Sequence, residues 1–150
     1  MRRAARRPLI VKLSPNVTRI EPAARAAAEA GADALSLVNT FIALAIDAQT
    51  RRPRLGNGFG GLSGPAIKPI AVRMVYEASK SVQIPVIGMG GISTAADVIE
   101  FMLAGATAVQ VGTASYWDPR ATEKIVGELA RWCAEHEVAR IAELTGAMVT

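Results

Sequence analysis

The stretch that decides the fold runs from residue 84 to residue 115 and reads IPVIGMGGISTAADVIEFMLAGATAVQVGTAS. Two short apolar runs, residues 84–87 and 108–111, are each followed by a glycine turn, and a segment with helical periodicity lies between them. Ser93 or Thr94 can cap the start of that helix. The order strand, turn, helix, strand, turn predicts a βαβ unit with parallel strands.

The two glycine turns of this unit predict an anion site. Both turns, Gly90-Gly91 and Gly112-Thr113, follow a strand, so a right-handed crossover places them at the same end of the sheet. Glycine leaves backbone N–H groups uncovered and a helix start adds partial positive charge, which together suit a phosphate. The alternative is that these glycines only make tight turns. The occurrence of two such turns as a pair favours the phosphate site.

Two more strands are predicted in the first quarter of the chain. Residues 9–13, LIVKL, have the continuous apolar character of a buried parallel strand, which Lys12 interrupts. Because an unpaired buried charge is costly, this lysine must reach either water at a sheet edge or a ligand at the strand end, and the pattern leaves both open. Residues 33–38 end in Asn39-Thr40, where barrel enzymes place substrate contacts; the alternative is a polar loop start.

The segment after this strand is a long connection, residues 41–64, and it is rich in glycine. Loops of this length inside compact domains are usually functional, and we expect residues 41–48 to form a short helix or part of a lid. Pro65 then begins a helix that ends near residue 81. Gly64 lies at its N-terminus, where the backbone can approach a ligand closely.

Helices are expected to alternate strictly with the strands. Thr18 can cap one that ends near residue 30, and Asp118-Pro119 begin one that ends near His136. Four strands and four principal helices correspond to half of a (β/α)8 barrel, since a complete one takes roughly 250 residues. The predicted fold class is therefore α/β with a half TIM barrel. An open four-stranded sheet is the alternative, although it leaves two free edges and one poorly covered face.

The composition excludes several classes of protein. The 150 residues, 51% apolar and 5% aromatic, suffice for one domain with a real core. No apolar run reaches membrane-spanning length, and no apolar segment follows the N-terminal arginines as it would in a secretory signal. The single cysteine, Cys133, excludes an internal disulfide framework and a CxxC metal site, is interpreted as a packing residue and is compatible with the cytoplasm.

The basic character of the chain is concentrated at its N-terminus. Arg2, Arg3, Arg6 and Arg7 equal the whole formal net charge of +4, and the other 13 basic side chains balance the 13 acidic ones. No interleaving of aromatic and basic residues accompanies this cluster. We therefore expect no nucleic-acid partner.

Five segments together resemble the C-terminal half of class 1B dihydroorotate dehydrogenase catalytic subunits. In chain order they read PLIVKLSPNVT, ADALSLVNT, AIDAQTRRPRLGNGFGGLSGPAIKPIAVRMVYE, IPVIGMGGI and VQVGTA. The combination of GGLSGPAIKP with the preceding NT is specific, whereas GMGG or VGT alone would be weak. The resemblance covers residues 8–136.

The resemblance implies that residues 1–150 form a single partial TIM-barrel domain with FMN at the C-terminal ends of its strands. The implied reaction is the oxidation of dihydroorotate to orotate in pyrimidine biosynthesis. The implied partner is a subunit with FAD and an iron–sulfur cluster that passes electrons to NAD, within a homo- or hetero-oligomer.

Residue roles carried over by resemblance divide between cofactor and substrate. The FMN-binding residues would be Lys12, Val38, Gly64, Gly90, Gly91, Gly112 and Thr113. Lys12 would lie by the pyrimidine edge of the flavin, where a cation stabilises negative charge, and the two glycine turns would hold the phosphate. Asn39 and Thr40 would form hydrogen bonds with the pyrimidine substrate.

The family's catalytic base, a cysteine in class 1 enzymes, belongs to a loop of the N-terminal half, which we expect to be absent here. Cys133 does not match that motif, so no catalytic residue is assigned and the 150 residues alone are expected to be inactive. The family's usual Gly-Met is replaced by Ala43-Leu44. Two alternatives stay open: a non-catalytic half barrel that binds phosphate or flavin and self-associates, and a dihydropyrimidine dehydrogenase-like FMN domain.

Overall fold

A four-stranded parallel sheet organises the chain in the computed structural model, which describes residue 4 and residues 6–149. Arg2 and Arg3 of the basic N-terminal cluster and Thr150 lie outside the described residues. The strands are β1 (Ile10–Lys12), β2 (Ala34–Leu37), β7 (Val86–Met89) and β8 (Ala108–Gln110), hydrogen-bonded in the order β1-β2-β7-β8. The predicted α/β class and the predicted parallel pairing of the βαβ unit are confirmed.

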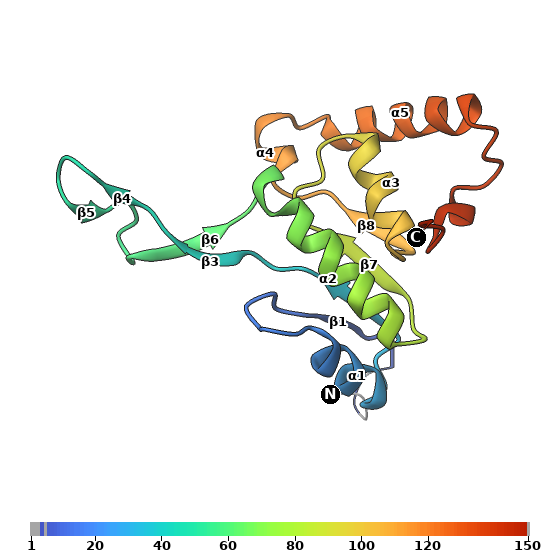
Figure 1. Ribbon diagram of the computed structural model, residues 1–150, viewed down its shortest axis with the longest axis horizontal. Helices are drawn as coiled ribbons and strands as arrows, with labels where there is room; N and C mark the ends of the chain where they lie inside the picture. The colour runs from blue at the N-terminus through green and yellow to red at the C-terminus, as the bar shows by residue number, and fades with distance from the viewer. Residues whose placement is uncertain (1–3, 5, 150) are drawn as a thin grey trace.

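Helices follow the strands as the alternation predicted. They are α1 (Glu21–Glu29), α2 (Lys68–Ser81), α3 (Ala95–Leu103), α4 (Ala114–Trp117) and α5 (Ala121–Glu135), with 3-10 helices η2 (Pro65–Ile67) and η3 (Ile141–Leu144). Because each strand lies beside the one before it in the sheet, right-handed crossovers put α1, α2 and α3 on the same face (Figure 1). Among the described residues, no helix combines the length and apolarity needed to cross a membrane.

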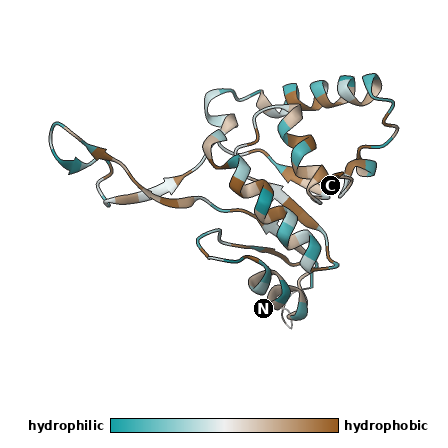
Figure 2. Ribbon diagram, viewed as in Figure 1, coloured by the Kyte–Doolittle hydropathy of each residue, from teal (hydrophilic) through white to brown (hydrophobic). Residues whose placement is uncertain are grey.

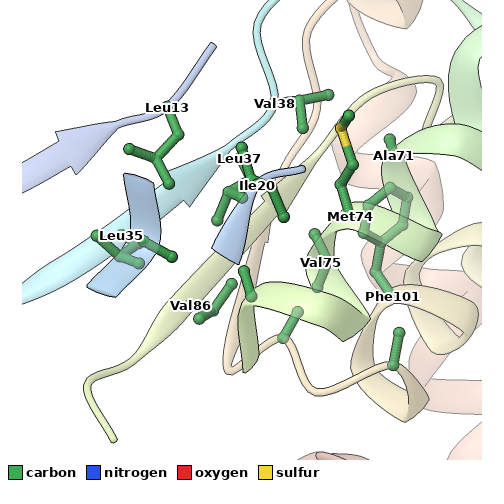
Figure 3. Packing of buried hydrophobic residues seen from close by; sticks show 14 of the residues in the cluster. Leu13, Ile20, Leu35, Leu37, Val38, Ala71, Met74, Val75, Val86 and Phe101 are labelled. Atoms are coloured by element: carbon green, nitrogen blue, oxygen red, sulfur yellow. The ribbon is translucent and has the colours of Figure 1, made fainter. Parts of the chain in front are cut away.

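The period-2 alternation of the strands separates a buried face from an open face. Leu35, Leu37 and Val86 face the helices and are almost completely buried; they pack with Met74 and other helix residues (Figure 3). The intervening positions include Lys12, Ser36 and Gln110 and form the other face. The core therefore lies between the sheet and α1 to α3, and the other face carries the polar side chains.

The centre of the βαβ unit forms as the sequence predicted. Thr94, one of the two expected caps, accepts a hydrogen bond from the backbone N–H of Asp97, whose carboxylate accepts one from the backbone N–H of Thr94 in return. A side chain at Gly88 would collide with the ring of Phe101, so this glycine lets α3 pack directly on β7. The strand itself begins two residues later than expected, at Val86.

The predicted start of the first helix was wrong. The helix α1 begins at Glu21 after Ile20, and the side chain of Thr18 provides no cap. Ile20 is fully buried and Pro22 occupies the first turn, where a missing N–H carries no cost. Core packing and the proline therefore set this boundary instead of a hydroxyl cap.

Of the two alternatives expected for residues 41–48, a short helix or part of a lid, the helix was wrong. Residues there form β3 (Phe41–Leu44) and β4 (Ile46–Asp47), which pair antiparallel with β6 (Phe59–Leu62) and β5 (Arg52–Pro53). We call residues 41–62 the arm; it projects away from the sheet and helices (Figure 1). The apolar run lacks the polar face of a surface helix, and Gly60 and Gly61 give it a strand partner. Brown segments along β3 mark its apolar side chains (Figure 2).

Candidate functional site

One cavity lies at the C-terminal ends of the four parallel strands, where α/β proteins bind ligands. Its volume is about 420 Å³. All nine residues singled out in the sequence line it: Lys12, Val38, Asn39, Thr40, Gly64, Gly90, Gly91, Gly112 and Thr113. The structure thus brings five separate segments of the chain to one place, and it joins the two predicted glycine turns in a single wall.

Backbone N–H groups at the β7 and β8 end of the cavity are free to bind an anion. Within the part of the chain that the structure describes, those of Gly90, Gly91, Gly112 and Thr113 donate to no protein acceptor. A Cβ added at Gly112 would meet nothing within 4 Å, so this residue faces open space. Gly91 has a φ of +77° and packs against Gly64, whose carbonyl oxygen would lie 2.7 Å from an added Cβ. These features form a cradle of uncovered donors.

The N-terminus of α3 contributes less to this cradle than the sequence suggested. The N–H groups around its start already have acceptors: those of Ser93 and Thr94, just before the helix, donate to the carboxylate of Asp97 at 2.8 and 2.9 Å. The N–H of Ala95 donates to Glu128 at 3.1 Å. These two carboxylates also offset the partial positive charge of the helix start. The available donors therefore belong to the glycine turns themselves.

Asp97 is the best-connected side chain next to the cradle. Burial alone would raise its pKa, but hydrogen bonds from Lys68, Ser93 and Thr94 outweigh the burial and lower the pKa to about 2. The ammonium of Lys68 lies 2.7 Å from carboxylate oxygens of both Asp97 and Glu100, and these hydrogen bonds raise the pKa of Lys68. This network ties the start of α2 to the start of α3, and so holds the loop that contains Gly90 and Gly91.

Lys12 lies at the opposite end of the cavity, on β1. It is an exposed side chain with no ion-pair partner among the described residues, and it is the cation among the described residues that line the cavity. Three strand spacings of about 4.8 Å separate β1 from β8, so the lysine strand and the far glycine turn lie about 14 Å apart. The cavity therefore suits an elongated ligand that is anionic at one end and electron-rich at the other.

The middle of the cavity is formed where β2 ends. The backbone N–H of Val38 donates to the carbonyl of Met89 at 2.9 Å, which joins the ends of β2 and β7. Asn39 and Thr40 follow, and Thr40 immediately precedes the arm. Uncharged hydrogen-bonding side chains thus lie between the cationic end and the anion cradle.

Several cavity residues were missed in the sequence. Ser36, Ser63, Gln110 and Trp117 also line the wall. Ser36 and Gln110 face each other across β7, with Oγ and Oε1 3.4 Å apart. Both are polar residues inside apolar strands, the same signal that singled out Lys12, so they could have been found. Trp117 lies on α4, a one-turn helix that the sequence pattern did not predict.

Other chemistry-bearing side chains lie away from the cavity. Cys133 and His136 belong to α5 and its C-terminal cap, and His136 stacks on Trp132. A larger, more open hollow of about 730 Å³ lies at the tip of the arm and is lined by Asp47, Arg52 and Arg54 among others. It shares no residue with the cavity that contains the predicted set.

Comparison with known proteins gives one consistent family. The family model described as dihydroorotate dehydrogenase matches residues 1–132. A Solibacter usitatus protein provisionally named dihydroorotate dehydrogenase A (fumarate) is 63% identical over 98% of this chain and 48% of its own length.

Two further relatives carry the name dihydroorotate dehydrogenase B (NAD(+)), catalytic subunit. That of Pelobacter propionicus is 58% identical over 98% of this chain and 48% of its own length. That of Geotalea uraniireducens is 56% identical over 100% of this chain and 49% of its own length. The chain spans about half the length of the curated relatives it matches. The family match and these identities confirm the resemblance seen in the motifs, and the chain belongs to the dihydroorotate dehydrogenase family.

Proposed function

We propose that this chain forms the FMN- and pyrimidine-binding part of an enzyme that oxidises dihydroorotate to orotate in pyrimidine biosynthesis. The observation that carries the proposal is the single cavity that contains all nine residues expected to contact cofactor or substrate. The match over residues 1–132 to the dihydroorotate dehydrogenase family supports the same reaction.

We further propose that the chain is the C-terminal half of a (β/α)8 barrel, in one partial domain. Four parallel strands in sequential order, with their helices on one face, correspond to an arc of such a barrel. In that arrangement the open face of the sheet is the inner wall, and Lys12, Ser36 and Gln110 point into the barrel.

The residues of the cavity fit FMN at both ends. The uncovered N–H groups of Gly90, Gly91, Gly112 and Thr113 would hold its phosphate without a paired cation. Lys12, about 14 Å away by strand spacing, would lie beside the ring system and stabilise negative charge there. When bound, FMN supplies a two-electron acceptor for hydride.

Substrate binding is assigned to the residues that follow β2. The amide of Asn39 and the hydroxyl of Thr40 would bind the polar edge of the pyrimidine ring. Among the described residues that line the cavity there is no Asp, Glu, His or Cys. The resemblance places the base that removes the substrate proton on a loop of the N-terminal half, and we propose that the described residues alone bind substrate without turning it over.

The relatives' names suggest how electrons leave the site. Two of the three relatives are named as catalytic subunits of the NAD(+) type, and a catalytic subunit implies a second subunit. We place this chain with them, in a cytoplasmic assembly whose partner carries FAD and an iron–sulfur cluster.

A matched pair of glycine substitutions tests the cofactor site. Gly112 and Gly127 both have open space where a Cβ would lie, but only Gly112 lines the cavity. Gly112→Asp places a carboxylate against the phosphate and should weaken FMN binding by about tenfold or more, while Gly127→Asp leaves it unchanged. Titration of the purified chain with FMN, followed by flavin fluorescence, measures both. Equal affinity in the two variants would contradict the assignment.

The absorbance of the FMN-loaded chain separates an enzyme from a binding module. Addition of dihydroorotate should leave the visible flavin bands unchanged, because the described cavity residues provide no base. Loss of those bands would show that turnover needs no further polypeptide. Failure of wild-type chain to bind FMN at all would overturn the cofactor assignment.

A further inference from the structure

Asn16 makes an unusual connection between two loops at the mouth of the cavity. Its side-chain nitrogen donates to the carbonyl of Thr40 at 3.1 Å, and its side-chain oxygen accepts from the backbone N–H of Ile42 at 2.8 Å. The C=O of one residue and the N–H of the residue two further on point to the same side of a strand. Asn16 therefore binds the free edge of β3 as a neighbouring strand would.

The loop that carries Asn16 is well fixed. Pro15 is fully buried, and the hydroxyl of Ser14 accepts hydrogen bonds from both the backbone N–H and the side-chain nitrogen of Asn16. This loop directly follows β1, the strand that ends in Lys12. Asn16 thus joins the end of the lysine strand to the start of the arm.

Thr40 is held from its other side as well. A Cβ added at Gly61, its neighbour on β6, would collide with the Thr40 hydroxyl oxygen and Cβ. The backbone of Thr40 is thus fixed by Asn16, while its side chain lies over a position where only glycine leaves room. Asn39 and Thr40 line the cavity, and Asn16 does not.

We propose that Asn16 is a positioning residue for substrate: it fixes the backbone at Thr40 and so holds Thr40 and the adjoining Asn39 in the cavity wall. The proposal rests on the proposed function, in which these two residues bind the pyrimidine. It assigns no contact between Asn16 and the ligand. The anion cradle on β7 and β8 is built independently of Asn16.

Two variants and a control separate this role from a general loss of structure. Asn16→Ala removes the side-chain hydrogen bonds to both Thr40 and Ile42, and Asn16→Asp keeps the acceptor for Ile42 but loses the donor to Thr40. As the control, Asn57→Ala removes the side chain of an exposed asparagine that lies on the arm and has no side-chain hydrogen bond within the described residues. Amide hydrogen exchange at Ile42, and calorimetric titration of the FMN-loaded full chain with orotate, are measured for all three.

In Asn16→Ala, the amide hydrogen of Ile42 should exchange with solvent at least about tenfold faster than in wild type. This variant should bind orotate about five- to tenfold more weakly, while its affinity for FMN stays within about twofold of wild type. In Asn16→Asp, the amide hydrogen of Ile42 should stay protected from exchange, but orotate binding should still be weaker than in wild type. Asn57→Ala should match wild type throughout.

Orotate affinity unchanged in Asn16→Ala would overturn the assignment, and so would an equal loss of FMN affinity, which would indicate general distortion. If the wild-type chain binds FMN but not orotate, the proposed substrate itself fails and the positioning role fails with it. Wild-type orotate binding with an unaffected Asn16→Ala variant overturns the positioning role alone.

Discussion

The body and the arm of this protein are stabilised in different ways. In the body, which we define as the parallel sheet and the helices outside residues 41–62, Leu35, Leu37 and Val86 are almost completely buried and Phe101 is fully inaccessible. In the arm, Ile42 is 70% exposed and Phe59 is 65% exposed, although both lie in regular strands. Burial stabilises the body, whereas the arm depends on backbone pairing between β3 and β6, which is marginal for an isolated hairpin.

The arm is attached to the body at its base. Phe41 packs against the core and Asn16 binds the edge of β3. Thr40 and Ser63, where the chain enters and leaves the arm, both line the cavity. The site therefore lies at the junction of a well-packed part and a weakly supported part, so each part can be perturbed separately.

The largest expected difference comes from the same substitution made in both regions. Phe101→Ala removes a fully buried ring that packs on Gly88 and should cost about 3–5 kcal/mol of unfolding free energy. Phe59→Ala in the arm should cost less than about 1 kcal/mol, because most of that ring is already in water. Urea denaturation of the two variants measures both. Similar losses would mean that the arm is part of the core.

Two glycines with nearly equal backbone angles give the next contrast. Gly91 has a φ of +77° and Gly58 in the arm a φ of +78°. An alanine at either position is strained by about 1–2 kcal/mol, but only at Gly91 would the Cβ also meet Gly64 and Lys68, at 2.7 and 2.9 Å. Gly91→Ala should therefore cost about 2–4 kcal/mol and weaken FMN binding. Thermal unfolding of both variants decides whether crowding or backbone angle dominates.

Two aspartates, Asp97 in the body and Asp47 in the arm, allow the stabilising effect of a buried hydrogen-bonded carboxylate to be compared with that of a more exposed one. The pKa of Asp97 falls from 3.8 to about 2 in the folded chain, so its contribution is present above about pH 4 and is lost as pH falls through 2. Asp97→Asn should cost about 2 kcal/mol at pH 7 and almost nothing near pH 2. The control Asp47→Asn, in the exposed arm, should change stability less. Urea unfolding as a function of pH measures the stability of both variants. A difference in unfolding free energy between wild type and Asp97→Asn that persisted at pH 2 would contradict this prediction.

The smallest expected effect on stability is a cut in the arm. Arg51 and Arg54 are exposed near its tip, while the body's Arg25 and Lys80 lie on helices. Brief trypsin treatment should cleave after Arg51 or Arg54 before it cleaves those helices, and the nicked protein should keep its helical circular dichroism. Mass spectrometry of the fragments identifies the sites. Earlier cleavage within α1 or α2 would show that the body is the weaker part.

The sequence predicted more of the body than of the arm because their local signals differ in strength. Apolar runs followed by glycine turns predicted β7, α3 and β8 closely, since parallel strands and their turns have strong local patterns. The apolar run at residues 41–48 has no such pattern, and its sequence is compatible with either a helix or a strand. Its strand partner lies about twenty residues further on, and that pairing is a non-local contact.

The candidate site shows the same division. Local sequence patterns were enough to predict an anion site at the paired glycine turns and to mark Lys12 as out of place in its strand. The position of Lys12 beside a ring came only from the resemblance. Trp117 could not be predicted, because its contribution depends on where α4 places it.

The tertiary structure then sets the partner of each of these groups. It directed the N–H groups around the start of α3 to Asp97 and Glu128, left those of the glycine turns uncovered, and placed Asn16 on the edge of β3. The physical reason is that a hydrogen-bonding group has a role only once its partners are fixed, and those partners come from segments distant in the chain.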